Sequence, residues 1–133
     1  MELFLASYGS AATALGVVAI LMLIQVLVAD ILGIVRRHVP GTPVNANHAD
    51  ALFRAARTVA NTNESIAIFI GALLFCVLVG ASSEWTGWWA WGFALCRAAY
   101  ALCYYANWPT LRSITFALSL ICLAALIVLG LLA

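Results

Sequence analysis

Charged residues are scarce in this chain of 133 residues. Only 8% of the residues are charged, whereas 66% are hydrophobic, and all six basic residues are arginines. A soluble globular domain carries about a quarter charged residues, so the composition excludes an ordinary soluble domain. The net charge of +1 gives no reason to expect a nucleic-acid partner.

The chain also lacks the spacings that mark common metal and catalytic sites. Its two histidines, His38 and His48, form no His-x-x-x-His pair, so no metal site is predicted. The four cysteines lie inside apolar stretches without a Cys-x-x-Cys pair, which favours buried free thiols over a zinc site or a disulfide framework. Neither a glycine-rich phosphate loop nor a nucleophile elbow occurs.

Long apolar stretches are what the chain has in abundance. Each is close to the roughly 20 residues that a helix needs to cross a bilayer. Backbone groups in lipid must be hydrogen-bonded within each segment, which favours helices over open strands. The sequence therefore predicts an all-α membrane protein, a bundle of four transmembrane helices in one domain over residues 1–133. The expected spans are residues 11–35, 50–80, 85–106 and 111–133.

The arginines predict an orientation in the membrane. All six cluster around the first and third connections, whereas Glu2 and Glu84 mark the opposite side. By the positive-inside rule, loops one and three should face the cytoplasm, with both termini and the second loop outside. Because Glu2 stands where a signal peptide has a basic segment, we expect a retained span rather than a removable signal.

Four polar residues, Arg54, Arg57, Asn61 and Glu64, stand at spacings of three, four and three before an uncharged run. On a helix they fall within a sector of about 80°. Ionisable side chains at membrane depth are costly and usually face a bundle interior or a water-filled cavity. Two cations, an amide and a carboxylate suit a zwitterionic ligand, so we interpret this face as a binding site.

A second polar group stands near the same end of the third expected span. Arg97, Tyr100 and Tyr104 are spaced by three and four residues, and Arg112 begins the fourth span. Spacings of three and four residues place side chains on one helix face. This half of the bundle carries an excess of positive charge, which predicts a ligand that is anionic or bears several carboxylates.

Simpler interpretations of these residues stay open. Arg36 and Arg37 can be topology signals that only orient the protein. Asp30 shares a helix face with Arg37 and can meet an arginine from another helix. Arg97 and Glu64 can form a bare interhelical ion pair. Polar groups from four helix ends nevertheless converge on one side of the membrane. This convergence favours a binding site, because orienting the protein in the membrane does not require all of these groups.

Two motifs resemble the signatures of a known family. The MAPEG family comprises membrane-associated proteins of eicosanoid and glutathione metabolism, and its Arg-x-x-x-Asn-x-x-Glu signature resembles RAARTVANTNE at residues 54–64. Its second signature resembles RAAYALCY at residues 97–104, followed by LRS at residues 111–113. The likeness covers nearly the whole chain. One departure is Ser65, where several family members have a tyrosine.

The resemblance implies a homotrimer that binds glutathione between neighbouring subunits near the cytoplasmic face. It implies a membrane transferase or peroxidase that activates the glutathione thiol toward a lipophilic electrophile or lipid peroxide arriving from the bilayer. The implied catalytic groups are Arg112, Arg37 and Ser113. The implied glutathione-binding residues are Arg36, Arg54, Arg57, Asn61, Glu64, Arg97, Tyr100 and Tyr104.

Two alternatives to that function stay open. The same family includes a non-catalytic, lipid-binding member, so the chain can be a non-enzymatic protein that binds lipid or serves as a subunit of a larger membrane assembly. A small transporter or channel is the second alternative. It requires a polar path across the whole membrane, and the outer half of this chain is nearly free of charge.

Overall fold

The computed structural model describes residues 6–133 and contains four helices within that range. Their bounds are α2 Gly9–Val35, α3 Ala51–Val79, α4 Ser83–Tyr105 and α5 Pro109–Leu131. The predicted all-α architecture is confirmed, and each helix begins and ends within two residues of its expected bounds. Glu2, which entered the orientation argument, lies outside the described residues.

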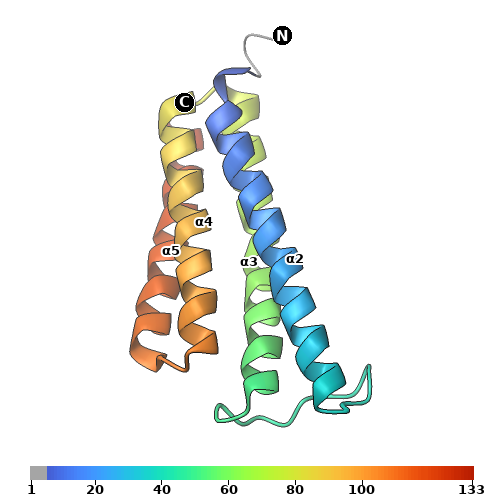
Figure 1. Ribbon diagram of the computed structural model, residues 1–133. Helices are drawn as coiled ribbons and strands as arrows, with labels where there is room; N and C mark the ends of the chain where they lie inside the picture. Colours follow the sequence, from blue (N-terminus) through green and yellow to red (C-terminus); the bar gives the residue numbers. More distant parts are fainter. Residues whose placement is uncertain (1–5) are drawn as a thin grey trace.

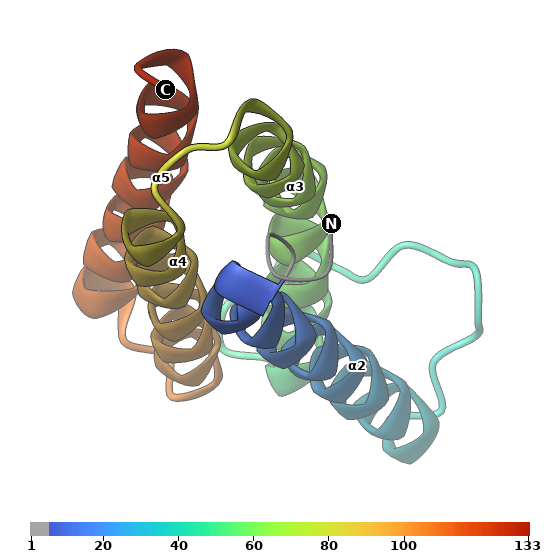
Figure 2. The same ribbon diagram turned by 90° about the horizontal axis from the view of Figure 1, so that it is seen from above.

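The four helices run alternately in opposite directions (Figure 1). The connection between α2 and α3 and the turn between α4 and α5 lie at one end of the bundle, and the C-terminus lies at the other. We call the first end the loop end; it comprises residues 36–50, residues 106–108 and the adjoining helix turns. Seen from above, α4 and α5 lie side by side, whereas α2 runs away from them toward its C-terminal end (Figure 2).

Local sequence explains where the helices begin and end. Asp50 caps α3, because its side chain accepts a hydrogen bond from the backbone N–H of Leu52 at 3.1 Å. Gly80 ends the same helix with φ +71°, a left-handed conformation that glycine adopts without a steric cost. Pro109 is the first residue of α5, where its missing N–H removes no helical hydrogen bond.

The core of the bundle combines small side chains with a central aromatic pair. Phe69 of α3 and Phe93 of α4 stack with ring centroids 4.3 Å apart, and both side chains are fully buried. Ala11 and Ala14 bring α2 close to them. All four cysteines are free, as the sequence predicts, although Cys96 is only half-buried.

Three of the four helices are long and apolar enough to cross a membrane: α2, α3 and α5. Large apolar side chains are exposed on them, such as Ile34 at 77% and Leu78 at 75%, and lipid is the solvent that accepts such a surface. The multiple apolar helices are those of a multi-pass integral membrane protein. The third expected span, residues 85–106, corresponds to α4, which is less apolar because it carries Arg97, Glu84 and many tryptophan and tyrosine rings.

Candidate functional site

A fully buried arginine joins two helices in the half of the bundle nearer the loop end. Nη2 of Arg97 on α4 donates to Oδ1 of Asn61 at 2.8 Å and to Oγ1 of Thr62 at 3.2 Å, both on α3. The Arg97 guanidinium also lies over the ring of Tyr100, 4.6 Å from its centroid. Because Arg97 is 0% exposed, it acts inside the subunit rather than on its surface.

The helical repeat of α3 explains why it meets Arg97 with neutral polar groups. Thr58, Thr62 and Ser65 follow each other at spacings of four and three, and all three side chains are buried. Glu64 is exposed and forms no ion pair with Arg97 within the described range. The bare Arg97–Glu64 pair considered from the sequence is therefore absent from residues 6–133, and an amide and a hydroxyl replace it.

Tyr104 of α4 contacts side chains of α5 and of the first loop. Its ring lies under the guanidinium of Arg112 from α5, 4.5 Å from the ring centroid. Its hydroxyl lies 3.4 Å from Nε2 of His48 in the loop before α3, and the two rings are inclined by only 16°. Tyr100 meets Tyr104 edge-on with ring centroids 5.5 Å apart. This cluster therefore links α4, α5 and the first loop.

Arg54 is the first of the four polar residues that the sequence predicts on one face of α3, which we call the polar stripe: Arg54, Arg57, Asn61 and Glu64. Its side chain is directed back to the loop. Its Nη1 donates to the carbonyl oxygens of His48 at 2.7 Å and of Ala49 at 3.0 Å. Hydrogen bonds from a charged donor are among the stronger ones in proteins. Arg54 thus holds His48 in the position from which it contacts Tyr104.

Other residues expected at the site stay apart from the Tyr104 cluster. Arg36 pairs with Asp50 at 3.8 Å, and Arg37 is exposed, with φ +53°. Oγ of Ser113 donates to the carbonyl oxygen of Pro109 at 3.0 Å, so its proton is used within α5. Arg36 and Arg37 line a cavity of about 510 Å³ at the loop end instead.

Two stripe residues of α3 face outward. Arg57 and Glu64 are exposed, and within residues 6–133 neither has a hydrogen bond or an ion pair. A cation and a carboxylate on one helix, seven residues apart, stand two turns from each other. Both side chains are therefore accessible at the surface.

Sequence reasoning missed three residues that complete this arrangement. Thr62 stands two positions before Glu64, and the sequence alone does not distinguish it from the other polar residues around it. Phe116 lies four residues after Arg112, a spacing that could have placed it on the same face, and its ring packs 6.0 Å from that of Tyr100. His48 was considered only as a metal ligand, and no group of metal-binding side chains is found in the described part of the chain.

These features define a multi-pass membrane protein with a helical bundle, whose buried and exposed polar groups gather toward one end. The chain matches the MAPEG family over residues 8–132 and belongs to that family. This family consists mostly of glutathione-dependent membrane enzymes. No curated protein matches the chain significantly.

Proposed function

We propose that the protein is a glutathione-dependent membrane transferase or peroxidase. The observation that carries the proposal is the position of Arg112 over Tyr104. Tyr104 contacts Tyr100, which lies under the guanidinium of Arg97, and Arg97 is hydrogen-bonded to Asn61 of α3. A cation and a phenol thus lie near the loop end, and the carboxylate of Glu64 stands midway along α3, in a bundle with many exposed apolar side chains. Family membership supports the same conclusion.

The donor set suits glutathione, which carries two carboxylates, an ammonium group and a thiol. Glu64 is exposed and supplies the carboxylate that an ammonium group requires. Arg57 is exposed on the same helix and can bind a carboxylate through two parallel hydrogen bonds. Arg36 is partly engaged with Asp50, so it would contribute a second, weaker cation.

Arg97 takes a different role in this proposal from the one that the family resemblance implies. Its burial keeps it from direct contact with a ligand at the subunit surface. It instead fixes the carbonyl end of the Asn61 amide, which leaves the NH₂ end of that half-buried side chain for a ligand. Arg97 is therefore a positioning residue.

We place the complete site between subunits of a homotrimer. Arg57 and Glu64 are exposed, with no hydrogen bond or ion pair in residues 6–133, and Arg36 and Arg37 line a separate cavity. A neighbouring copy brings its own first loop against the exposed face of α3. All the basic side chains lie in the loop-end half, which favours a cytoplasmic loop end.

When bound, glutathione supplies a thiol that becomes a nucleophile on losing its proton. A free cysteine-type thiol has a pKa of about 8.5, so only a few per cent is ionised at neutral pH. Arg112 would stabilise the thiolate electrostatically, since a nearby cation favours the charged form. Ser113 is the weaker candidate, because its hydroxyl proton is already donated to Pro109. Arg37 would act only from a neighbouring copy.

A titration of the detergent-purified protein with glutathione tests this proposal. Calorimetry measures binding, and the ultraviolet absorbance of the thiolate measures ionisation. We expect saturable binding with a thiolate signal at neutral pH, and loss of that signal in Arg112→Ala. Leu111→Ala, at an exposed neighbouring position, is the matched control and should keep it. Absence of binding up to millimolar glutathione would overturn the proposal.

A non-enzymatic role in binding lipid is the second candidate. The observation that favours it is the row of exposed apolar side chains on α2, including Ile20, Leu23 and Ile31. Glutathione binding without any thiolate signal, in a protein that copurifies with a fixed partner, would support this role over catalysis.

A further inference from the structure

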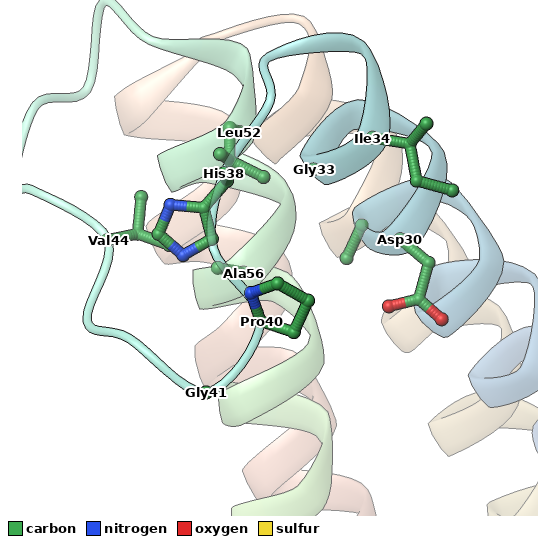
Figure 3. A pocket seen from close by; sticks show the side chains of 10 residues that line it. Asp30, Gly33, Ile34, His38, Pro40, Gly41, Val44, Leu52 and Ala56 are labelled. Carbon is green, nitrogen blue, oxygen red and sulfur yellow. The ribbon is translucent and has the colours of Figure 1, made fainter.

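A cavity of about 460 Å³ lies between the C-terminal end of α2, the first loop and the start of α3. It contains none of the residues assigned to the glutathione site. Figure 3 shows Asp30 of α2 and His38 of the loop at this cavity, on either side of Pro40 in this view. The other lining residues are Ala29, Gly33, Ile34, Gly41, Val44, Leu52 and Ala56.

Asp30 is a carboxylate without a partner. Its side chain is exposed and has neither a hydrogen bond nor an ion pair within residues 6–133, where Arg36 pairs with Asp50. Asp30 lies five residues before the end of an apolar helix, about 7.5 Å along its axis. A carboxylate at that depth of a membrane helix is costly unless a cation or water meets it. None of the ten lining residues is an arginine or a lysine, so the cavity wall offers Asp30 no such cation.

His38 is the second polar side chain that lines the cavity. Its Nε2 atom lies 3.0 Å from the carbonyl oxygen of Thr42, and a carbonyl only accepts, so Nε2 donates. The hydroxyl of Thr42 lies 3.3 Å from the same nitrogen. In the neutral imidazole this leaves Nδ1 as an acceptor. Both polar side chains that line the cavity thus favour a donor-rich guest.

We propose that this cavity binds the primary ammonium head of an ethanolamine phospholipid. A primary ammonium has three N–H donors, which suit acceptors on the cavity wall, above all the carboxylate of Asp30. A quaternary ammonium, as in a choline lipid, is recognised by aromatic cages. None of the ten lining residues is phenylalanine, tyrosine or tryptophan, so the cavity discriminates against choline.

The surroundings of the cavity suit the rest of such a lipid. A second cavity shares His38, Val44 and Leu52 with it and is lined by Arg36 and Arg37. The lipid phosphate would therefore use the two cations that the proposed function gives to glutathione, and the two ligands would exclude each other there. Apolar side chains exposed along α2 accept the acyl chains. Charge complementarity thus extends over both parts of the head group: carboxylate to ammonium and guanidinium to phosphate.

Native mass spectrometry of the detergent-purified protein tests the proposal. Phosphatidylethanolamine and phosphatidylcholine with identical acyl chains are added in equal amounts, and the bound lipid is counted. We expect about tenfold preference for the ethanolamine lipid, the effect of one charge-assisted hydrogen-bonding group. Asp30→Asn should abolish the preference, so that the two lipids bind in equal amounts. Glu84→Gln, which removes a carboxylate from the first turn of α4, is the matched control and should keep the preference.

Ala56→Leu gives an independent second test. This substitution fills the cavity from α3 without changing any charge, and it should displace the ethanolamine lipid while α-helical content stays the same. Equal binding of the two lipids by the unmodified protein, or an unchanged preference in Asp30→Asn, would overturn the proposal. So would equal binding of soluble phosphoethanolamine, because the ligand would then not be a lipid. Glutathione takes no part in this experiment, so its outcome is separate from that of the transferase proposal.

Discussion

The guanidinium of Arg97 and the side-chain amide of Asn61 form a hydrogen bond of 2.8 Å between α4 and α3. Asn61→Ala removes the acceptor and leaves a buried charged donor with only Thr62 as its polar partner on α3. Leaving a buried polar group unpaired costs about 1–3 kcal/mol, and more when it is charged. We expect a loss of stability in that range, measured by reversible unfolding in mixed micelles.

Asn61→Asp separates this bond from a simple packing effect. The carboxylate has nearly the same shape as the amide and accepts from Arg97 with an opposite charge. Stability should therefore be kept or raised, while the NH₂ donor proposed to face glutathione is lost. Comparable destabilisation by Asn61→Asp and Asn61→Ala would show that Arg97 does not depend on this acceptor.

The helices were predictable from sequence, whereas the choice of partners for their polar residues was not. Asp50, Gly80 and Pro109 are local signals, and they fix helix bounds without reference to the rest of the chain. The spacing of Arg97 and Tyr100 placed them on one face, but periodicity along one helix does not say which residue of another helix they meet. The ligand contact of Arg97 that the family resemblance implies stays a prediction, and the structure shows its side chain buried against Asn61.

The contacts of the first loop are still harder to predict from sequence than those between helices. His48 has no periodic neighbours, and its position on Tyr104 depends on bonds from Arg54 to two loop carbonyls. No pattern in the sequence encodes that contact. The exposed residues Arg57 and Glu64 were correctly placed on one helix face, but their ligand contacts remain a proposal.

Arg54→Ala should release the first loop. Removing the guanidinium eliminates both hydrogen bonds to the carbonyls of His48 and Ala49, so His48 is no longer held against Tyr104. Hydrogen exchange of the amides at residues 45–50 should become faster, because local opening costs less free energy. Arg57→Ala, three residues further along α3, removes an exposed arginine without such contacts and is the control. Equal exchange in the two variants would contradict this role of Arg54.

Gln25→Leu should stabilise the bundle. Gln25 is 1% exposed in the middle of α2, and neither polar atom of its amide has a hydrogen-bond partner among the described residues. A buried unpaired amide costs about 1–3 kcal/mol, so an apolar side chain of similar size should raise the free energy of unfolding by a similar amount. Gln25→Glu, which keeps the polar group and adds charge, should destabilise. A lower stability of Gln25→Leu would mean that water or another subunit satisfies the amide.

Arg112→Ala should lower the rate of glutathione conjugation to an aryl halide far more than Ser113→Ala does. If Arg112 lowers the pKa of the bound thiol from about 8.5 to about 6.5, its removal reduces the thiolate at neutral pH about 20-fold. Ser113 is exposed and donates within its own helix, so its substitution should change the rate less than about twofold.

The pH dependence distinguishes loss of thiol activation from loss of binding. Raising the pH ionises the thiol without help from the protein, so the activity of Arg112→Ala should approach that of the unmodified protein at alkaline pH. Arg112→Lys keeps the charge but not the planar guanidinium over Tyr104. Its activity at neutral pH should therefore lie between that of Arg112→Ala and that of the unmodified protein. A defect in Arg112→Ala that is the same at every pH would assign Arg112 to binding, and a larger defect in Ser113→Ala would assign thiol activation to the serine.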